Sequence, residues 1–346
     1  MAKEKLFSLP QTRGTFMLTG VVTGEQSEKF YEDKTTKTHK PFRSVSFGIK
    51  LSEDKAVYVG LNGMVQEAVY FIRSENKAKG VKSDTKRVPW KERYTFHEDG
   101  YRMLGVSTGV KKVTDAKGNE VNERKTLAPY DACEEIGENL KDGLSVFARG
   151  SIEYSTYNDK HQTRFTLGQV SLCKKEIDFS AEGYAPNAQF TQVIVFTGIK
   201  KEEAPPRFAV SAKIVTYNSI EDAEFYITNA ELAGLFRKKL KPYTAIKVWG
   251  DILVEHDTQP AEDEADVWGT ENKMERVGSP TKRLLVITGA DPSTIDTDTY
   301  SEENIDEAIA KIAAAKQAQE DYGGKEPASG AWGSVGSIED DEDEPW

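Results

Sequence analysis

The sequence has little of what an exported protein, a membrane protein or a metalloenzyme would need. It contains two cysteines, Cys133 and Cys173, and four scattered histidines. Two cysteines are too few for a disulfide framework, and no histidine stands at metal-ligand spacing from another histidine or a cysteine. No apolar run approaches the roughly 20 residues of a membrane span, and the first residues lack an apolar signal core. We therefore expect a cytoplasmic protein without a membrane partner.

Recognisable catalytic motifs are also missing. No glycine-rich loop leads into Lys-Ser or Lys-Thr, and there is no Gly-x-Ser-x-Gly elbow. The stretch His97–Gly100 (HEDG) suggests metal binding at first sight, but we interpret it as a polar turn before a strand. We expect no enzyme activity, no metal and no other cofactor.

Charge is distributed unevenly along the chain. The net charge of −11 would ordinarily argue against a nucleic-acid partner. However, residues 326–346 hold seven acids and no base, whereas residues 71–93 hold eight bases against three acids. A polyanion responds to local sign, so the mean charge excludes nothing here.

Two stretches one hundred positions apart have the same pattern. Leu140–Ile152 reads LKDGLSVFARGSI and Leu240–Ile252 reads LKPYTAIKVWGDI. Both alternate with period two, which predicts strands, and a helix-like segment precedes each. Both also place a glycine at the same step, Gly150 and Gly250, where a strand can bend or another backbone can approach closely.

The segments around this repeat follow one order in both halves. The first half predicts strands at 15–23, 42–51, 57–61, 144–154 and 162–173, with a helix at 131–140 before the fourth strand. The second half predicts strands at 191–199, 207–215, 223–227, 244–255 and 283–288, with a helix capped by Asn229 before the fourth strand. Five strands with a helix between the third and fourth is the order of an OB-fold, whereas a β-sandwich needs about seven strands. We predict a mainly β protein with two tandem OB-folds, small five-stranded Greek-key barrels.

The domain boundaries follow from this order. We expect the first OB-fold at residues 1–178, with a basic and aromatic insertion at about 63–129, and the second at 188–292, each with its own core. Residues 300–321 have the periodicity of an amphipathic helix. Residues 322–346, rich in Gly, Ala, Ser and acid, are expected to be a disordered acidic tail.

OB-folds usually bind on the outer face of strands two and three and in the loops between strands one and two and four and five. Single-stranded nucleic acid is held there by basic grooves and stacking aromatics. In the first half these places and the insertion concentrate both residue types. The candidate nucleic-acid-binding residues are Lys29, Phe30, Tyr31, Lys34, Lys37, Lys40, Phe42, Arg43, Lys50, Tyr58, Arg87, Trp90, Lys91, Arg93, Tyr94, Phe96, Tyr157, Lys160 and Arg164.

Some of these residues have a structural alternative. Phe42 can pack beneath the insertion, and the lysine-rich insertion, which continues through Tyr101 and Arg102, can be an ordinary solvated loop. Tyr154 falls on the core-facing side of its strand.

The second half is a weaker candidate for the same chemistry. Its loop between strands four and five is acidic, with Glu255, Asp257, Glu262, Asp263, Glu264 and Asp266. Such a loop repels phosphates, so we expect the first domain to be the main binder. Trp249 lies on the outward side of its strand and can contact DNA, the first domain or another subunit.

The sequence SIEDDEDEPW at residues 337–346 combines six acids with Pro345 and Trp346. Here the chain resembles bacterial and bacteriophage single-stranded DNA-binding proteins, in which an OB-fold is followed by a flexible linker and an acidic run ending in Pro-Phe. The resemblance implies that Asp343, Glu344, Pro345 and Trp346 dock replication, recombination and repair proteins, and that the acids compete with DNA for the basic groove. This chain has Trp in place of Phe, two OB-like halves and a large insertion. Partner identity therefore does not carry over, and self-association stays open.

We accordingly expect a sequence-nonspecific single-stranded DNA-binding protein of phage type that acts in DNA replication, recombination and repair in a bacterial host cell. The alternative is an acidic DNA mimic that occupies a host DNA-processing enzyme. The acidic loop and tail favour the mimic, and the basic insertion argues against it. A nuclease on the OB scaffold is a third hypothesis, which no residue cluster supports.

Overall fold

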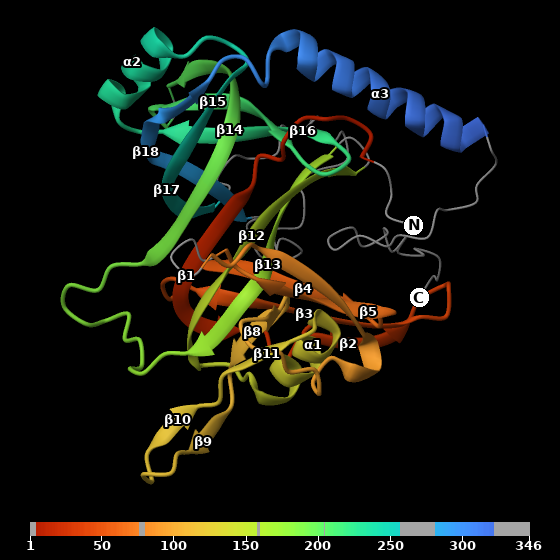
Figure 1. Cartoon of the computed structure of the whole chain (residues 1–346). Helices are drawn as coiled ribbons and strands as arrows, with labels where there is room; N and C mark the ends of the chain where they lie inside the picture. The colour runs from red at the N-terminus through yellow and green to blue at the C-terminus, as the bar shows by residue number, and fades with distance from the viewer. Residues whose placement is uncertain (1–4, 76–79, 158–159, 204, 257–280, 322–346) are drawn as a thin grey trace, which may run out of the picture.

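The computed structural model describes residues 5–75, 80–157, 160–203, 205–256 and 281–321. Two β-barrels are stacked along the molecule, and a long helix lies beside the second (Figure 1). The elements of the first half are β1 (Gly14–Thr23), β2 (Tyr31–Thr35), β3 (Pro41–Lys50), β4 (Ala56–Met64), β5 (Ala68–Arg73), β6 (Asp84–Pro89), the 3-10 turn η2 (Trp90–Glu92), β7 (Arg102–Met103), β8 (Val106–Gly109), β9 (Lys112–Thr114), β10 (Glu120–Asn122), β11 (Lys125–Leu127), α1 (Pro129–Asn139), β12 (Ser145–Tyr157) and β13 (Lys160–Leu172). Those of the second half are β14 (Asn187–Glu202), β15 (Arg207–Val215), β16 (Ile220–Ile227), α2 (Ala230–Lys239), β17 (Thr244–His256), β18 (Thr281–Asp296) and α3 (Glu302–Asp321).

The first barrel closes through five strands. β1 pairs with β3, β3 with β4, and β4 runs parallel to β13 at the pair Gly60–Thr166. β13 pairs with β12, and β12 returns to β1. α1, which begins at Pro129 as the first helical residue, connects the third strand to the fourth. This is the pairing scheme of an OB-fold.

The second barrel repeats the scheme. β14 pairs with β15 and β17, β15 with β16, β17 with β18, and β16 runs parallel to β18 at Tyr226–Val286. α2 again separates the third and fourth strands, and the Asn229 side chain caps it by accepting hydrogen bonds from the backbone N–H groups of Glu231 and Leu232. The predicted fold, two tandem OB-folds in a mainly β chain, is confirmed.

The barrels are joined through their first strands. β1 and β14 pair antiparallel, with Phe16 directly opposite Phe190. On their other sides Phe16 lies opposite Gly150 and Phe190 opposite Gly250, the two glycines of the repeat. A pseudo-two-fold axis therefore passes through the phenylalanine pair. One hydrophobic core contains residues of both barrels, which corrects the expectation of two separate cores.

Gly150 and Gly250 stand at matching β-bulges. The pairing register shifts next to each of them. A Cβ atom on Gly150 would lie 1.8 Å from the carbonyl oxygen of Thr166, and one on Gly250 would lie 1.9 Å from that of Val286. The predicted close approach of a second backbone is thus present at both positions, and only glycine leaves room for it.

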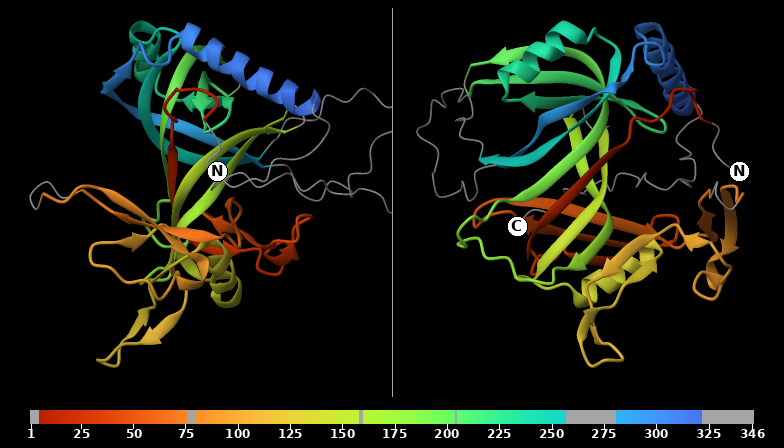
Figure 2. Two further views of the ribbon diagram at one scale, coloured as in Figure 1. Left: turned by 45° about the vertical axis from the view of Figure 1, so that its right-hand side comes forward. Right: turned by 60° about the vertical axis from the view of Figure 1, so that its left-hand side comes forward.

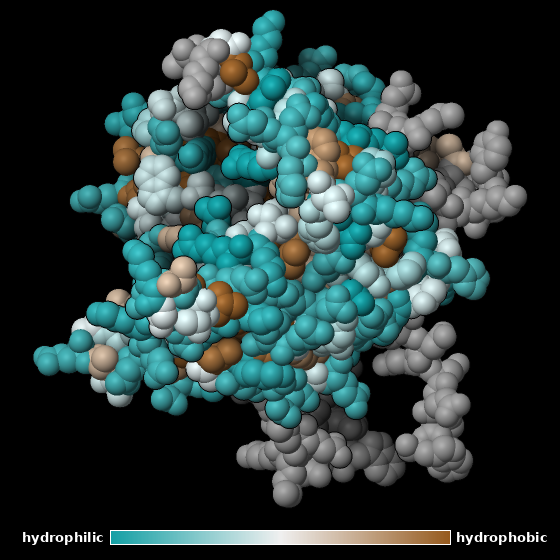
Figure 3. Space-filling model, turned by 60° about the horizontal axis from the view of Figure 1, so that its bottom comes forward, coloured by the Kyte–Doolittle hydropathy of each residue, from teal (hydrophilic) through white to brown (hydrophobic). Residues whose placement is uncertain are grey.

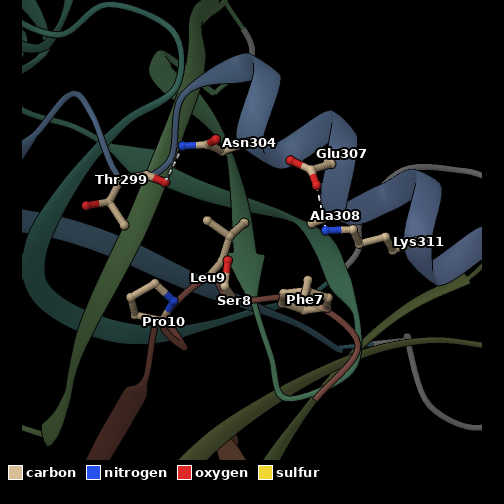
Figure 4. A pocket seen from close by; sticks show the side chains of 9 residues that line it. All are labelled: Phe7, Ser8, Leu9, Pro10, Thr299, Asn304, Glu307, Ala308 and Lys311. Carbon is tan, nitrogen blue, oxygen red and sulfur yellow. Dashed lines mark hydrogen bonds and ion pairs between the residues drawn. The ribbon is translucent and has the colours of Figure 1, made fainter. Parts of the chain in front are cut away.

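The N-terminal segment crosses from the first barrel to the second, where α3 covers it (Figure 4). Phe7 and Leu9 share a small buried core with Tyr300, Ile305 and other residues of the second barrel and α3. The Tyr300 hydroxyl donates to the carbonyl of Pro10 at 3.2 Å. α3 therefore holds the two halves together.

Seen from the end of the molecule that the first barrel forms, the surface is mostly hydrophilic, with hydrophobic side chains in small separate groups (Figure 3). Within the described ranges, no helix has both the length and the apolar character needed to cross a membrane.

Candidate nucleic-acid interface

The outer face of the first barrel is a floor of small side chains beside one exposed aromatic ring. Ser46 lies opposite Gly60, and Gly60 in turn pairs with Thr166 of β13. Tyr58 lies on the same face opposite Gly48 and is 57% exposed. A Cβ atom on Gly48 would lie 3.4 Å from the ring, so the tyrosine leans over the glycine backbone. A nucleobase could stack on such a ring without displacing protein side chains.

Positive charge at this face comes from Arg164. In the amide orientation that satisfies both of its polar atoms, Asn62 accepts a hydrogen bond from Nη1 of Arg164 at 3.1 Å. The exposed Arg164 lies opposite Glu153 across the β12–β13 pair. Burial raises the pKa of the Glu153 carboxyl, while a hydrogen bond with Thr166 and the charge of Arg164 act in the opposite direction. The ionised form of Glu153 is therefore less strongly favoured than that of an ordinary surface carboxylate.

Arg283 brings a further guanidinium to this region from the second barrel. Its Nη2 donates to the carbonyl of Thr163 at 2.7 Å and its Nη1 to the carbonyl of Tyr58 at 3.4 Å. The guanidinium also lies 5.0 Å from the centre of the Phe165 ring. The sequence did not indicate this contribution, because Arg283 stands in the half with the acidic loop and no local pattern links it to Tyr58.

Two predicted stacking residues of the first half are buried. Phe30 is 5% exposed and packs edge-on against Phe47, with ring centres 6.4 Å apart. Phe42 is also 5% exposed, at a position of β3 that has β2 on one side and β4 on the other. Both rings are inaccessible to a base, so the expectation that they stack on DNA is corrected.

Tyr31 and Arg43 connect the β2–β3 hairpin to α1. Tyr31 is half-buried and its ring packs against the helix backbone. Arg43 lies 2.9 Å from carboxylate oxygens of both Asp33 and Glu134 and 4.1 Å above the centre of the Tyr130 ring. Two carboxylates already neutralise this guanidinium, which is therefore a poor phosphate ligand.

The lysines of this hairpin remain candidates. Lys29, Lys37 and Lys40 are exposed, and Lys34 is exposed but lies 2.8 Å from Glu32. Lys50 is half-buried at the end of β3. Lys50 lies two residues along β3 from Gly48, the partner of Tyr58, whereas Lys34, Lys37 and Lys40 lie toward the other end of that strand.

The aromatic candidates of the insertion mostly serve its own packing. Trp90 and Phe96 pack on a small core that includes Val69, Phe71 and Val88. The rings of Phe71 and Phe96 meet edge to face at 4.7 Å. Trp90 and Phe96 are partly buried and contribute to the packing of the insertion, and their stacking on DNA stays a prediction.

Arg93 and Tyr94 attach the insertion to α1. Nε of Arg93 lies 2.8 Å from Asp131, and the guanidinium stacks 4.3 Å from the Trp90 ring and 4.8 Å from the Tyr94 ring. The Tyr94 hydroxyl donates to Asp131 at 2.5 Å and accepts from the N–H of Ala128 at 3.1 Å. Burial of the hydroxyl, followed by its bond to Asp131, raises the pKa of Tyr94 to about 12. Both residues thus form contacts within the protein, while the Tyr94 side chain stays 42% exposed.

The remaining candidates are exposed or lie outside the described side chains. Arg87 is exposed and pairs with Glu67 at 2.9 Å, and Lys91 is exposed. Tyr157 and Lys160 belong to β12 and β13, but their side chains lie outside the described part. The tail residues Asp343, Glu344, Pro345 and Trp346 lie outside it as well. Within the described residues, no cluster of three or more His, Cys, Asp or Glu side chains could hold a metal ion.

The corresponding face of the second barrel is closed. Tyr226 occupies the position that Gly60 has in the first barrel, and it is 2% exposed. It forms a buried group on this face with Ala209, Leu284 and Val286. The Arg207 guanidinium lies 4.1 Å above the Tyr226 ring and pairs with Glu202 at 2.6 Å and Glu255 at 3.0 Å. In the described part of this face, the open floor is filled by Tyr226 and the Arg207 guanidinium is neutralised by two carboxylates.

A trough of about 610 Å³ lies across the junction of the barrels, lined by residues of β1, β12, β13, β14, β17 and β18. Arg149 and Trp249, which occupy equivalent positions in the repeat, both line it. Trp249 is 42% exposed, and a Cβ atom on Gly289 would lie 2.5 Å from its indole nitrogen. Trp249 is therefore a surface residue at the junction of the barrels.

Two solved structures of the single-stranded DNA-binding protein from Thermus aquaticus are similar to this chain. The wild-type protein is 9% identical with a TM-score of 0.39, over 82% of this chain and 93% of that chain. A deletion mutant of that protein is 11% identical with a TM-score of 0.37, over 81% of this chain and 94% of that chain. No curated protein matches the chain. The YorF family model matches residues 75–325, from the insertion to α3, and the chain therefore belongs to the YorF family.

Proposed function

We propose that this protein binds single-stranded DNA without sequence preference, on the outer face of its first barrel. The observation that carries the proposal is the contrast between the two equivalent faces of the repeat. The first has Gly60 at its centre and an exposed Tyr58, whereas the second is filled by Tyr226 and Leu284. An open floor beside an exposed ring and a guanidinium is what a strand with unpaired bases requires.

The forces in this complex would be stacking and phosphate contact. One base stacks on Tyr58, which contributes about 1–3 kcal/mol. Arg164, Arg283 and the exposed lysines of the β2–β3 hairpin attract the phosphates. The Ser, Gly and Thr floor presents few groups that could distinguish one base from another, so the binding tolerates any sequence.

We further propose that the protein coats exposed strands during DNA replication and recombination, as a phage protein in the cytoplasm of a bacterial cell, and does not catalyse a reaction. Residues 337–346 would recruit replication, recombination and repair proteins. An aromatic side chain next to a proline, as in Pro345-Trp346, suits a small apolar pocket with a basic rim. The preceding acids increase the rate of encounter with such a pocket.

Fluorescence anisotropy with labelled oligo-dT and with a duplex of equal length tests the binding proposal. Wild-type protein should prefer the single strand, with an affinity that falls steeply as salt rises. Y58A should weaken binding about tenfold, consistent with loss of one stacked base. Y217A, which removes a tyrosine 36% exposed at the β15–β16 turn, is the matched control and should bind like wild type.

Equal affinity for duplex and single strand, or a Y58A variant that binds like Y217A, would overturn the proposal. Absence of oligonucleotide binding together with tight association with a DNA-processing enzyme would support the DNA-mimic hypothesis.

Truncation of residues 337–346 tests the recruiting role separately. DNA affinity should stay the same or increase, because the competing acids are gone, while pull-down of replication proteins should be lost. W346A, which keeps every acid, should lose the pull-down but keep the DNA affinity of the full chain. Unchanged pull-down after truncation would refute the recruiting role.

A further inference from the structure

The insertion carries a three-stranded antiparallel sheet with the order β6–β5–β7. Its β5–β6 hairpin projects away from the first barrel (Figure 2). Val69 and Phe71 of β5, together with Val88 of β6, are buried in the small core of the insertion. Because successive residues of a strand point to opposite faces, Tyr70 and Ile72 lie on the other, outer face.

The outer face has a tyrosine at its centre. Tyr70 is on the middle strand and lies directly opposite Arg87 of β6. On the other side its carbonyl accepts a hydrogen bond from the N–H of Leu104 at 2.7 Å, next to the pair formed by Ile72 and Arg102. Side chains opposite one another in such a sheet have Cβ atoms about 4.5–5.5 Å apart. Arg87 and Leu104 therefore flank Tyr70, and Arg102 lies on the diagonal.

These side chains are accessible. Tyr70 is 38% exposed and Leu104 is 41% exposed. Arg87 and Arg102 are exposed as well. An aromatic ring between two guanidiniums is thus presented to solvent on a sheet whose other face is packed.

Charges on the inner face are compensated within the insertion. Lys86 lies 2.5 Å from Glu98, and Arg73 lies 4.0 Å from Asp84. Lys86 also lies 4.6 Å from the centre of the Tyr101 ring. Of the described residues on that side, Lys86 and Arg73 each have a carboxylate partner.

The arginines on the outer face are less strongly paired with carboxylates than the cations on the inner face. Arg87 pairs with Glu67 at 2.9 Å, but the two side chains are 60% and 90% exposed. Such an exposed pair contributes about 0–1 kcal/mol, so a phosphate can replace the carboxylate. Among the described residues Arg102 has no carboxylate partner. The outer face therefore has net positive charge around its tyrosine.

We propose that this outer face, with Tyr70 at its centre and Arg87 and Arg102 beside it, is a second contact surface for single-stranded DNA. The occupant follows from the chemistry: an exposed ring takes a base, and two weakly paired guanidiniums take the phosphates next to it. This inference rests on the proposed function. β5 begins after a connection of only three residues, 65–67, from β4, the strand that carries Tyr58. A strand bound at Tyr58 can thus continue onto the insertion.

Two surfaces that hold one strand act together only if the strand reaches both. The second contact then becomes intramolecular, and its effective concentration raises the affinity for long strands without changing that for short ones. The surface therefore predicts an effect that depends on oligonucleotide length. If the barrel face acted alone, replacing Tyr70 would not change the affinity for strands of any length.

The test compares oligo-dT of about 8 and about 30 nucleotides, since one OB-fold holds about 4–16 nucleotides. Y70A should bind the long strand about tenfold more weakly and the short strand like wild type. R87A/R102A should do the same and should lower the salt dependence for the long strand. Y70F keeps the ring and should retain long-strand binding. K111A/K117A, which removes two exposed lysines near the β9–β10 hairpin of the same insertion, is the matched control.

Long-strand binding by Y70A equal to that of wild type would overturn this inference and leave the proposed function intact. So would loss of a protein partner without any change in DNA affinity, because the face would then dock a protein. If wild-type protein binds neither oligonucleotide, the proposed function fails, and the inference fails with it.

Discussion

Replacement of either glycine of the repeat tests whether the two barrels form one cooperative unit. In G150A and G250A the new methyl group meets a backbone carbonyl oxygen at 1.8 Å or 1.9 Å. Ordinary contact begins at 3.4 Å, so the facing strand must recede by roughly 1.6 Å. A displacement of this size would lengthen a normal hydrogen bond past an N···O distance of about 3.5 Å, beyond which it is no longer a bond.

The expected loss of stability comes from the strand pairs beside the bulge. Loss of one or two buried ladder hydrogen bonds costs about 1–3 kcal/mol, and the steric overlap adds about 1–3 kcal/mol. We expect each variant to lower the free energy of unfolding by about 3 kcal/mol. Gly234 provides the control, since its Cβ position in α2 meets nothing within 4 Å. G234A should stabilise the protein by about 0.5–1 kcal/mol, because alanine is the better helix former.

Urea unfolding followed by circular dichroism measures all three variants. Because one core contains residues of both barrels, G150A and G250A should each shift a single transition to lower urea with little change in slope. Two separate transitions, with each variant moving only one, would refute the single cooperative unit. A loss of less than about 0.5 kcal/mol in both variants would refute the steric argument.

Three further predictions concern single side chains. E153Q should bind single-stranded DNA more tightly than wild type near pH 8, and its affinity should rise less than that of wild type when the pH is lowered. Burial raises the pKa of Glu153, so in wild type a lower pH protonates the carboxylate and removes its repulsion of phosphate. An E153Q pH profile that matches wild type by anisotropy would contradict this role. R207A should leave DNA affinity within about twofold of wild type, because Glu202 and Glu255 already neutralise Arg207; a larger loss would implicate the second barrel in binding. I305A should destabilise the protein by about 2–5 kcal/mol, since Ile305 is fully buried between α3 and the N-terminal segment, and thermal unfolding that matches wild type would show that α3 is dispensable.

The fold could be predicted because its signals are local. Strand alternation, the Asn229 cap and the repeated glycine are each visible within a few residues, and together they gave the strand order of both barrels. β14 and β18 are longer than predicted, 187–202 and 281–296 against 191–199 and 283–288. Their extra residues include polar positions whose pairing partners lie far away in sequence.

The remaining features depend on long-range contacts. The pairing of Phe16 with Phe190 brings together strands more than 170 residues apart, and each strand alone looks like an ordinary first strand. Several strands of the insertion, β8 with β11 and β9 with β10, are paired through only three residues, too few for a clear period. Tyr70 was not among the predicted binding residues, and Phe42, which alternation assigned to the outer face, is buried.

The two barrels differ at the residue that determines whether the outer face of the barrel is open or filled. Glycine at position 60 leaves the first face open, while tyrosine at the equivalent position 226 fills the second. A closed barrel can then serve as a scaffold: it pairs its first strand with β1, completes the core around Phe16, and sends Arg283 to Tyr58. An isolated first barrel would lose that guanidinium and leave the edge of β1 unpaired. The proposed binding surface therefore draws on both halves: Tyr58 and Arg164 could be predicted from the first half, whereas Arg283 could not.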